Sequence, residues 1–88
     1  MKEKELERVL KALANRRRLA ILKYLKKNKD ASVGEISEHI CLSMKATSKH
    51  LSVLAAADIL NRQQRGSLGF YWLAGDMPKP ARDVIKNI

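Results

Sequence analysis

The stretch of residues 32–57 constrains the fold most, because it carries two helix-start signals close together. Ser32 and Glu35 have the spacing of a capping box, in which the serine hydroxyl accepts a hydrogen bond from the third backbone N–H of the helix and the glutamate accepts one from the serine N–H. A helix is therefore predicted to begin directly after Ser32. Three apolar residues fall on one face of this helix: Val33, Ile36 and Ile40.

A second helix is predicted after a short break. The segment His39–Ser43 interrupts the apolar pattern, and Ser43 is a suitable N-cap. Two short helices joined by three or four residues form a helix-turn-helix. The apolar stripe of the second helix is Thr47, Leu51, Leu54 and Ala55.

The outer face of the second helix indicates what it contacts. Its N-terminal half presents Met44, Lys45, Ser48 and Lys49, and its polar side chains can reach DNA base edges or phosphates. The helix N-terminus adds a partial positive charge. Only one of the nine acidic residues, Asp58, lies within residues 39–75. A nucleic acid can therefore approach this face without repulsion, although a solvated surface helix without acids has the same pattern.

The overall charge favours an anionic partner. Eighteen Lys and Arg against nine Asp and Glu give a formal charge of +9, a balance typical of nucleic-acid-binding domains. At 88 residues, of which 45% are hydrophobic, the chain is predicted to form one domain, residues 1–88. The single cysteine excludes an internal disulfide, and no apolar run of about 18 residues or signal-peptide core is present, so a cytoplasmic location is expected.

Two further helices are predicted before the capping box. Residues 2–13 carry a narrow apolar stripe that suits a dimer contact, an ordinary core helix, or both. Asn15 is a plausible cap for a helix over residues 16–27. The arginines of its first turn oppose the helix dipole, and they could contact phosphate, pair with the acids of the first helix, or simply be solvated. The stripe of the first helix is Leu6, Val9, Leu10 and Leu13.

After the helix-turn-helix, the pattern changes to that of strands. Residues 60–64 and 70–73 are predicted strands, joined by residues 65–69. A hairpin with glycine beside arginine at its tip suits a wing that probes DNA, because glycine permits the turn and arginine reaches phosphates or a narrow minor groove. A basic hairpin can also be an exposed sheet edge protected by charge. The wing residues expected at DNA are Arg62, Arg65, Gly66 and Ser67.

A short terminal helix is predicted for residues 81–88, after a break that contains two prolines. Eight residues are marginal as an isolated helix, so this one is expected to pack on the first helix of the same or another subunit. Residues 1–14 and 80–88 are accordingly the expected dimerisation helices. The contacts expected from the terminal helix are Val84, Ile85 and Ile88.

In this order of elements, the chain resembles the ArsR/SmtB family of small bacterial and archaeal repressors. The resemblance covers about residues 6–73 and rests on the strings LKALANRRRLAILKYL, SVGEISEHICLSMKATSKHLSVLAAADIL and RQQRGSLGFYWL. It implies a mainly α fold with a small β-hairpin, a winged helix-turn-helix, which forms a homodimer through its first and last helices. It also implies operator binding, usually repression that an inducer releases.

The resemblance further implies the roles of individual residues. It places Met44, Lys45, Ser48 and Lys49 at major-groove bases or nearby phosphates, and residues 62–67 in the wing. Together with Ser43 and Thr47 of the same helix start, these are the expected DNA-binding residues.

Several positions depart from the family pattern. The Cys-x-Cys metal pair of many members is here Ser32 and Gly34, and the last helix offers Asp83 without the histidine that other members use. Neither family metal site is therefore present, and no cofactor is expected. Cys41 replaces a frequent glycine in the turn, which predicts strain if its φ is positive. Thr47 replaces a usual valine and is expected to return its hydroxyl to a carbonyl one turn earlier.

Other chemistry has less support in the sequence. A transition metal would need the cluster Glu35, His39, Cys41 and His50, but His50 lies on a different helix. Cys41 could act as a thiol sensor, because Lys45 and the next helix N-terminus favour the thiolate, or it could merely fill the turn. No nucleophile with a base, no acid pair and no glycine-rich phosphate loop points to an enzyme.

The sequence therefore predicts a sequence-specific DNA-binding transcriptional regulator, a homodimeric repressor of an inverted-repeat operator. Its expected partners are double-stranded DNA and a second copy of the chain, and the inducer is not identified. The alternative is a winged-helix module that binds protein or RNA, with the positive charge serving solubility. Membrane-surface binding is disfavoured, because the apolar stripes of residues 2–29 are narrow enough to be used up by a core.

Overall fold

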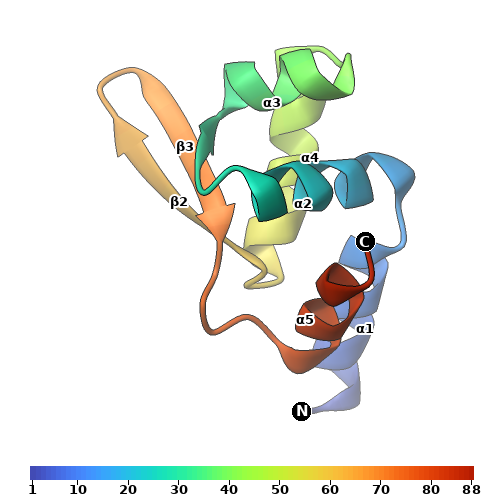
Figure 1. Ribbon diagram of the computed structural model, residues 1–88. Coiled ribbons are helices and arrows are strands. Elements are labelled where there is room, and N and C mark those ends of the chain that lie inside the picture. Colours follow the sequence, from blue (N-terminus) through green and yellow to red (C-terminus); the bar gives the residue numbers. More distant parts are fainter.

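The computed structural model describes all residues, 1–88, and has five helices and one three-stranded antiparallel sheet (Figure 1). None of the helices is both long enough and apolar enough to cross a bilayer. In chain order, the elements are α1 (Glu3–Leu13), α2 (Arg16–Lys27), β1 (Ala31–Ser32), α3 (Val33–Ile40), α4 (Met44–Ala56), β2 (Leu60–Arg65), β3 (Leu68–Leu73) and α5 (Lys79–Lys86).

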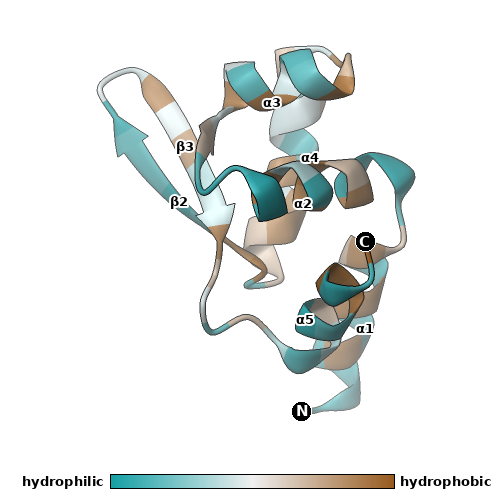
Figure 2. Cartoon of the chain, viewed as in Figure 1, coloured by the Kyte–Doolittle hydropathy of each residue, from teal (hydrophilic) through white to brown (hydrophobic).

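The helices are arranged around α2, which contacts each of the other four. In Figure 1, α1 and α5 lie side by side at one end, α3 and α4 lie on the other side of α2, and the β2–β3 hairpin projects away from the helices. Figure 2 shows that β2 is almost entirely hydrophilic, whereas α1 and α5 carry apolar segments. The fold is the predicted mainly α domain with a hairpin that extends from it.

Local side-chain caps fix the starts of the three central helices. The Asn15 carboxamide oxygen accepts from the N–H of Arg18 at 3.1 Å. In the capping box, Ser32 Oγ accepts from the Glu35 N–H at 3.2 Å, and the Ser32 N–H donates to Glu35 Oε1 at 2.8 Å. Ser43 Oγ accepts from a backbone N–H in the first turn of α4 at 3.1 Å. All three predicted caps are confirmed, because a cap depends only on residues that are neighbours in sequence.

The ends of α3 and α4 each place a non-glycine residue in the left-handed region. Cys41 has φ 55° and Asp58 has φ 61°. In both cases the next N–H bonds a carbonyl of the last helical turn, as in a Schellman motif. The positive φ on which the predicted strain at Cys41 depended is therefore present, and α3 continues through Ile40, so the turn is shorter than the predicted His39–Ser43.

The core lies where α2, α3 and α4 meet the inner face of the sheet. The seven largest side chains with relative exposures below 2% come from α2, α3, α4 and the segment just before β2. These residues are Ile21, Leu22, Ile36, Thr47, Leu51, Leu54 and Ile59.

The hairpin is tighter than predicted. The ladder between β2 and β3 extends to the pair Arg65 and Leu68, so only Gly66 and Ser67 form the turn, instead of residues 65–69. Gly66 has φ +63°, and a glycine at the first of two turn residues matches a type II′ hairpin turn. Because this turn suits the twist of the strands, pairing persists up to the glycine.

Two further features differ from the sequence prediction. The strand β1, only two residues long, pairs with β3 at Tyr71 and Phe70, where no strand was predicted. The terminal helix begins at Lys79 and ends at Lys86, two residues earlier than predicted. Proline within the first turn needs no N–H partner, so Pro80 is accommodated inside the helix.

Candidate nucleic-acid interface

The helix α4 is held in place by its inner face and presents the predicted outer face. Leu51 and Leu54 are completely buried. Met44 is 55% exposed, and Lys45 and Lys49 are exposed as well. These outer side chains therefore stand on a rigid support, which is a requirement for reading DNA in a groove.

The electrostatics of this face favour an anion. The first turn of α4 contains no acidic residue, and the helix N-terminus contributes its own partial positive charge. The three ion pairs of the structure involve neither Lys45 nor Lys49. Ser43 is exposed and Ser48 is half-buried beside these lysines. Both ammonium groups are thus free to bind phosphate or base edges.

Thr47 is not part of this surface, contrary to the sequence prediction. Its relative exposure is 0%, because it lies on the inward stripe of α4 together with Leu51 and Leu54. Its hydroxyl is also the one buried side-chain polar atom without a hydrogen-bond partner, so the predicted bond to a carbonyl one turn earlier is absent. A buried hydroxyl without a partner destabilises the folded state by about 1–3 kcal/mol.

Thr47→Val is therefore expected to raise the free energy of unfolding by about 1 kcal/mol and to leave DNA affinity unchanged. The exchange keeps the branched shape and removes the unpaired hydroxyl. Urea denaturation and a DNA titration would measure the two effects. Ser48→Ala on the outer face is the matched control, expected to change affinity more than stability. A lower stability of Thr47→Val would show that the hydroxyl has a partner in solution.

The arginines of the wing are bound to their own sheet. Arg62 Nε donates to the Tyr71 hydroxyl at 3.1 Å, and one of its Nη atoms donates to Gln64 Oε1 at 2.7 Å. Arg65 lies over the Phe70 ring, 4.4 Å from the ring centroid. Both remain exposed, but neither extends from the hairpin tip as a free cation.

The hairpin tip itself is open. Gly66 and Ser67 are exposed, and no atom lies within 4 Å of where a Cβ on Gly66 would be. Leu68, directly after the turn, is 51% exposed, and the sequence analysis did not select it. The sequence does indicate Leu68, because it is an apolar residue next to a glycine turn at the tip of a basic hairpin.

The arginine run has a structural role that the sequence analysis missed. Arg17 donates to the carbonyl of Ile40, at the C-terminus of α3, at 3.1 Å. Arg18 donates to the carbonyls of Ala12 at 2.7 Å and Lys11 at 3.0 Å, at the C-terminus of α1. Cations stabilise helix C-termini, where carbonyls lack partners and the dipole is negative. These arginines therefore hold neighbouring helices and do not pair with the acids of α1.

His50, on the flank of α4, lies beside an arginine of α2. Its Nδ1 lies 3.3 Å from an Nη atom of Arg18. Burial, followed by the charges of Arg18 and Arg17, lowers the pKa of His50 below its ordinary value of 6.5. This shift favours the neutral imidazole, whose Nδ1 accepts the hydrogen bond because a guanidinium can only donate.

This pKa shift predicts how stability depends on pH. The unfolded chain takes up a proton at His50 more readily than the folded chain does. The contribution of His50 to the free energy of unfolding is therefore complete above the unfolded pKa of about 6.5, and it is lost as the pH drops below that value. The melting temperature is expected to fall between about pH 7.5 and about pH 5.5, and His50→Gln is expected to reduce this difference. His39→Gln is the control. An unchanged difference in His50→Gln would refute this assignment.

The expected dimer residues divide into three groups by their exposure. Val9, Leu13 and Ile85 are only 2%, 5% and 6% exposed in the single chain, so they belong to its core and have little area left for a partner. Leu10 is 49% exposed. The remaining three are half-buried: Leu6, Val84 and Ile88.

Three of the four side chains considered for a metal are engaged in other contacts. Glu35 closes the capping box, the His39 ring stacks on Tyr24 at 4.4 Å between centroids, and His50 accepts from an arginine. No group of three or more His, Cys, Asp or Glu side chains is placed to hold a metal ion. Cys41 is exposed as a free thiol in the turn.

Comparisons with known proteins place this geometry in a family. The family model described as "Bacterial regulatory protein, arsR family" matches residues 15–62. The "Transcriptional activator HlyU" of Vibrio cholerae is 36% identical over 80 residues, which are 91% of this chain and 73% of that protein. The "Transcriptional repressor SdpR" of Bacillus subtilis is 34% identical over 65 residues, 74% of this chain and 71% of that protein.

Among solved structures, one match is the homodimeric winged helix-turn-helix DNA-binding domain of a possible ArsR-family transcriptional regulator from Mycobacterium bovis. It superposes with a TM-score of 0.81 at 26% identity, over 96% of this chain and 74% of that one. The segment matched by the family model, residues 15–62, is more than half of the chain and contains α2, α3 and α4. The chain therefore belongs to the arsR family of bacterial regulatory proteins.

Proposed function

We propose that this chain is a homodimeric transcriptional regulator that inserts the outer face of α4 into the major groove of an inverted-repeat operator. The observation that carries the proposal is an acid-free face with two unpaired lysines on a helix whose inner residues are fully buried. Membership of the arsR family supports this use of the face, because its members include regulators of transcription.

In this proposal, the residues of α4 divide the work by chemistry. Lys45 and Lys49 bind phosphates or base acceptors, and Met44 is placed for apolar contact with a thymine methyl group. Ser43 and Ser48 can donate hydrogen bonds to the phosphates of the DNA backbone beside them. The wing adds Arg62, Arg65, Gly66 and Ser67 at an adjacent groove.

The dimer contact is proposed for α1 and α5, through Leu6, Leu10, Val84 and Ile88. These side chains keep exposed area in the single chain, and the two helices lie together at the end of the molecule away from the hairpin (Figure 1). The Mycobacterium bovis domain is homodimeric, which supports the same assembly here. A two-fold dimer should bind half-sites about one helical turn of DNA apart, or a multiple of it.

We further infer that the protein acts in the cytoplasm as a repressor. A dimer bound over a promoter excludes RNA polymerase by occupying the DNA, so repression requires no additional binding surface on the protein. The relatives include both a repressor and an activator, so the direction of regulation has to be measured. A reporter gene placed behind the operator would measure it. Reduced transcription is expected.

Selection of bound sequences from random DNA would test the proposed function directly. The expected result is enrichment of an inverted repeat with a fixed half-site spacing. Binding without enrichment would contradict sequence-specific regulation and favour a non-specific module for nucleic acid. No binding to DNA at low salt would contradict the proposal as a whole.

A further inference from the structure

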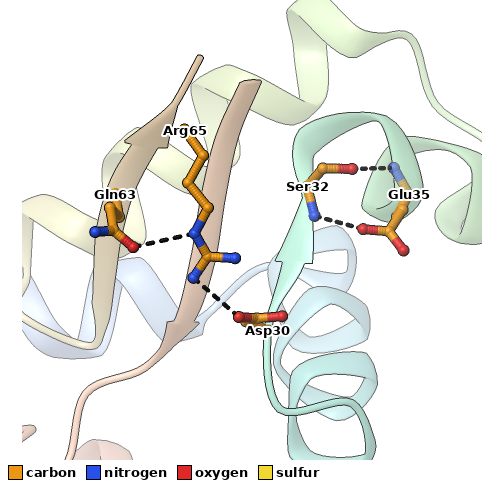
Figure 3. A network of polar contacts seen from close by, with 5 residues as sticks. All are labelled: Asp30, Ser32, Glu35, Gln63 and Arg65. Atoms are coloured by element: carbon orange, nitrogen blue, oxygen red, sulfur yellow. Dashed lines mark hydrogen bonds and ion pairs between the residues drawn. The ribbon is translucent and has the colours of Figure 1, made fainter. Parts of the chain in front are cut away.

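The two wing arginines differ in the charge of their partners. Arg62 is bound only by neutral groups, a tyrosine hydroxyl and a glutamine amide oxygen. Arg65 donates from Nε to Gln63 at 3.0 Å and from an Nη atom to Asp30 Oδ2 at 3.1 Å (Figure 3). The guanidinium of Arg65 is therefore ion-paired with a carboxylate, while that of Arg62 is not.

The strand β1 brings Asp30 to the wing, where Asp30 contacts Arg65, although these two residues are 35 positions apart in sequence. In the sheet order β1-β3-β2, Asp30 precedes one edge strand and Arg65 lies on the other. The Arg65 side chain therefore crosses β3, over the Phe70 ring, to reach the carboxylate. This contact directs the guanidinium back across the sheet instead of outward from the hairpin tip.

Asp30 is thus an acid in direct contact with an arginine of the wing. An Nη group that donates to a carboxylate must break that bond before it can donate to a DNA phosphate, since both are anionic oxygen acceptors. The pair is exchangeable, because both side chains keep about half of their area exposed, 44% for Arg65 and 45% for Asp30. Exposed ion pairs contribute little stability, so a phosphate can displace the carboxylate.

We propose that Asp30 competes with DNA phosphate for Arg65 and so limits the affinity of the wing for DNA. Asp30 is then a residue that determines affinity without itself binding DNA. This inference rests on the proposed function, because it requires the wing to approach DNA.

The test uses the full chain and a fluorescent duplex of random sequence, titrated at several salt concentrations. Asp30→Asn removes the charge and keeps an oxygen acceptor. It is expected to bind roughly two- to fivefold more tightly. One additional phosphate contact should also steepen the slope of log affinity against log salt by about 0.9.

Asp83→Asn is the matched control. It also removes one negative charge, from an exposed pair with Lys79 at 3.0 Å on α5. It should leave the salt slope unchanged. Arg65→Gln provides the second control, because Asp30→Asn should have no effect on the slope in that background. An equal effect in both backgrounds would overturn the inference in favour of general charge.

The failures of the two proposals are distinguishable. If the wild-type chain binds DNA and Asp30→Asn leaves affinity and slope unchanged, the competition is refuted and the DNA-binding function stands. Weaker binding of Asp30→Asn would also refute it, because the pair would then position the wing for DNA. If neither chain binds the duplex at low salt, the proposed function itself fails.

Discussion

The double variant Lys45→Ala, Lys49→Ala is expected to lose at least roughly thirtyfold in operator affinity. Each lysine contributes about 1–3 kcal/mol if it contacts a base or phosphate, and about 1.4 kcal/mol corresponds to a factor of ten. Both ammonium groups are exposed and outside the ion pairs of the structure, so no intramolecular contact is lost with them. Fluorescence anisotropy with the selected operator would measure the change.

The matched control is Lys23→Ala, Lys27→Ala. These lysines are also exposed and four residues apart, but they lie on α2, so the net charge changes equally. This variant should bind the operator nearly as well as the wild type. If the Lys45/Lys49 variant keeps wild-type affinity, or if both variants lose affinity equally, α4 is not the DNA-reading helix.

The single variants separate the two kinds of contact. A lysine that binds only phosphate weakens binding to every sequence and lowers the salt slope by about 0.9 when it is removed. A lysine that reads a base lowers the preference for the operator over random DNA. Lys45→Ala and Lys49→Ala are therefore to be compared on both duplexes.

Leu10→Glu is expected to convert the dimer to a monomer and to lower operator affinity by about a hundredfold or more. Leu10 keeps 49% of its area exposed on α1, and a carboxylate buried there against a second copy would have no partner. Loss of the linked second half-site removes an avidity gain of about 10²–10⁴. Size-exclusion chromatography with light scattering would measure the mass of the protein, and a DNA titration would measure its affinity.

The control for this variant is Leu68→Glu at the wing tip. Leu68 is 51% exposed, so the change in surface is nearly the same, but the residue begins β3, and the β2–β3 hairpin projects away from α1 (Figure 1). It should remain a dimer. A dimeric Leu10→Glu with unchanged melting temperature would place the dimer contact elsewhere.

The sequence predicted the features that depend on near neighbours. The caps Asn15, Ser32 and Ser43 each accept a hydrogen bond from a backbone N–H three residues later, so their spacing can be recognised in the sequence alone. The inward stripe of α4 follows from helical periodicity in the same way. The family resemblance then correctly indicated the winged helix-turn-helix, because its landmarks fall within these local patterns.

The missed features depend on residues that are distant in sequence. The strand β1 is two residues long and exists only because β3 pairs with it. The partner of Arg65 is Asp30, and the partner of Arg17 is the carbonyl of Ile40, contacts that no periodicity encodes. Thr47 was predicted both to belong to the inward stripe of α4 and to bind DNA, and its burial shows that only the first prediction is correct.

Three cations of α2 each serve the C-terminus of a different helix: Arg17 that of α3, Arg18 that of α1, and Lys26 that of α5 through the carbonyls of Ile85 and Ile88. Each of these cations donates to neutral carbonyls, so it keeps its positive charge, and the net charge that a distant polyanion meets remains the formal +9. Replacing one of these cations by a neutral residue would consequently weaken a contact between two helices as well as lower the net charge, so a loss of DNA affinity in such a variant would not by itself indicate a contact with DNA.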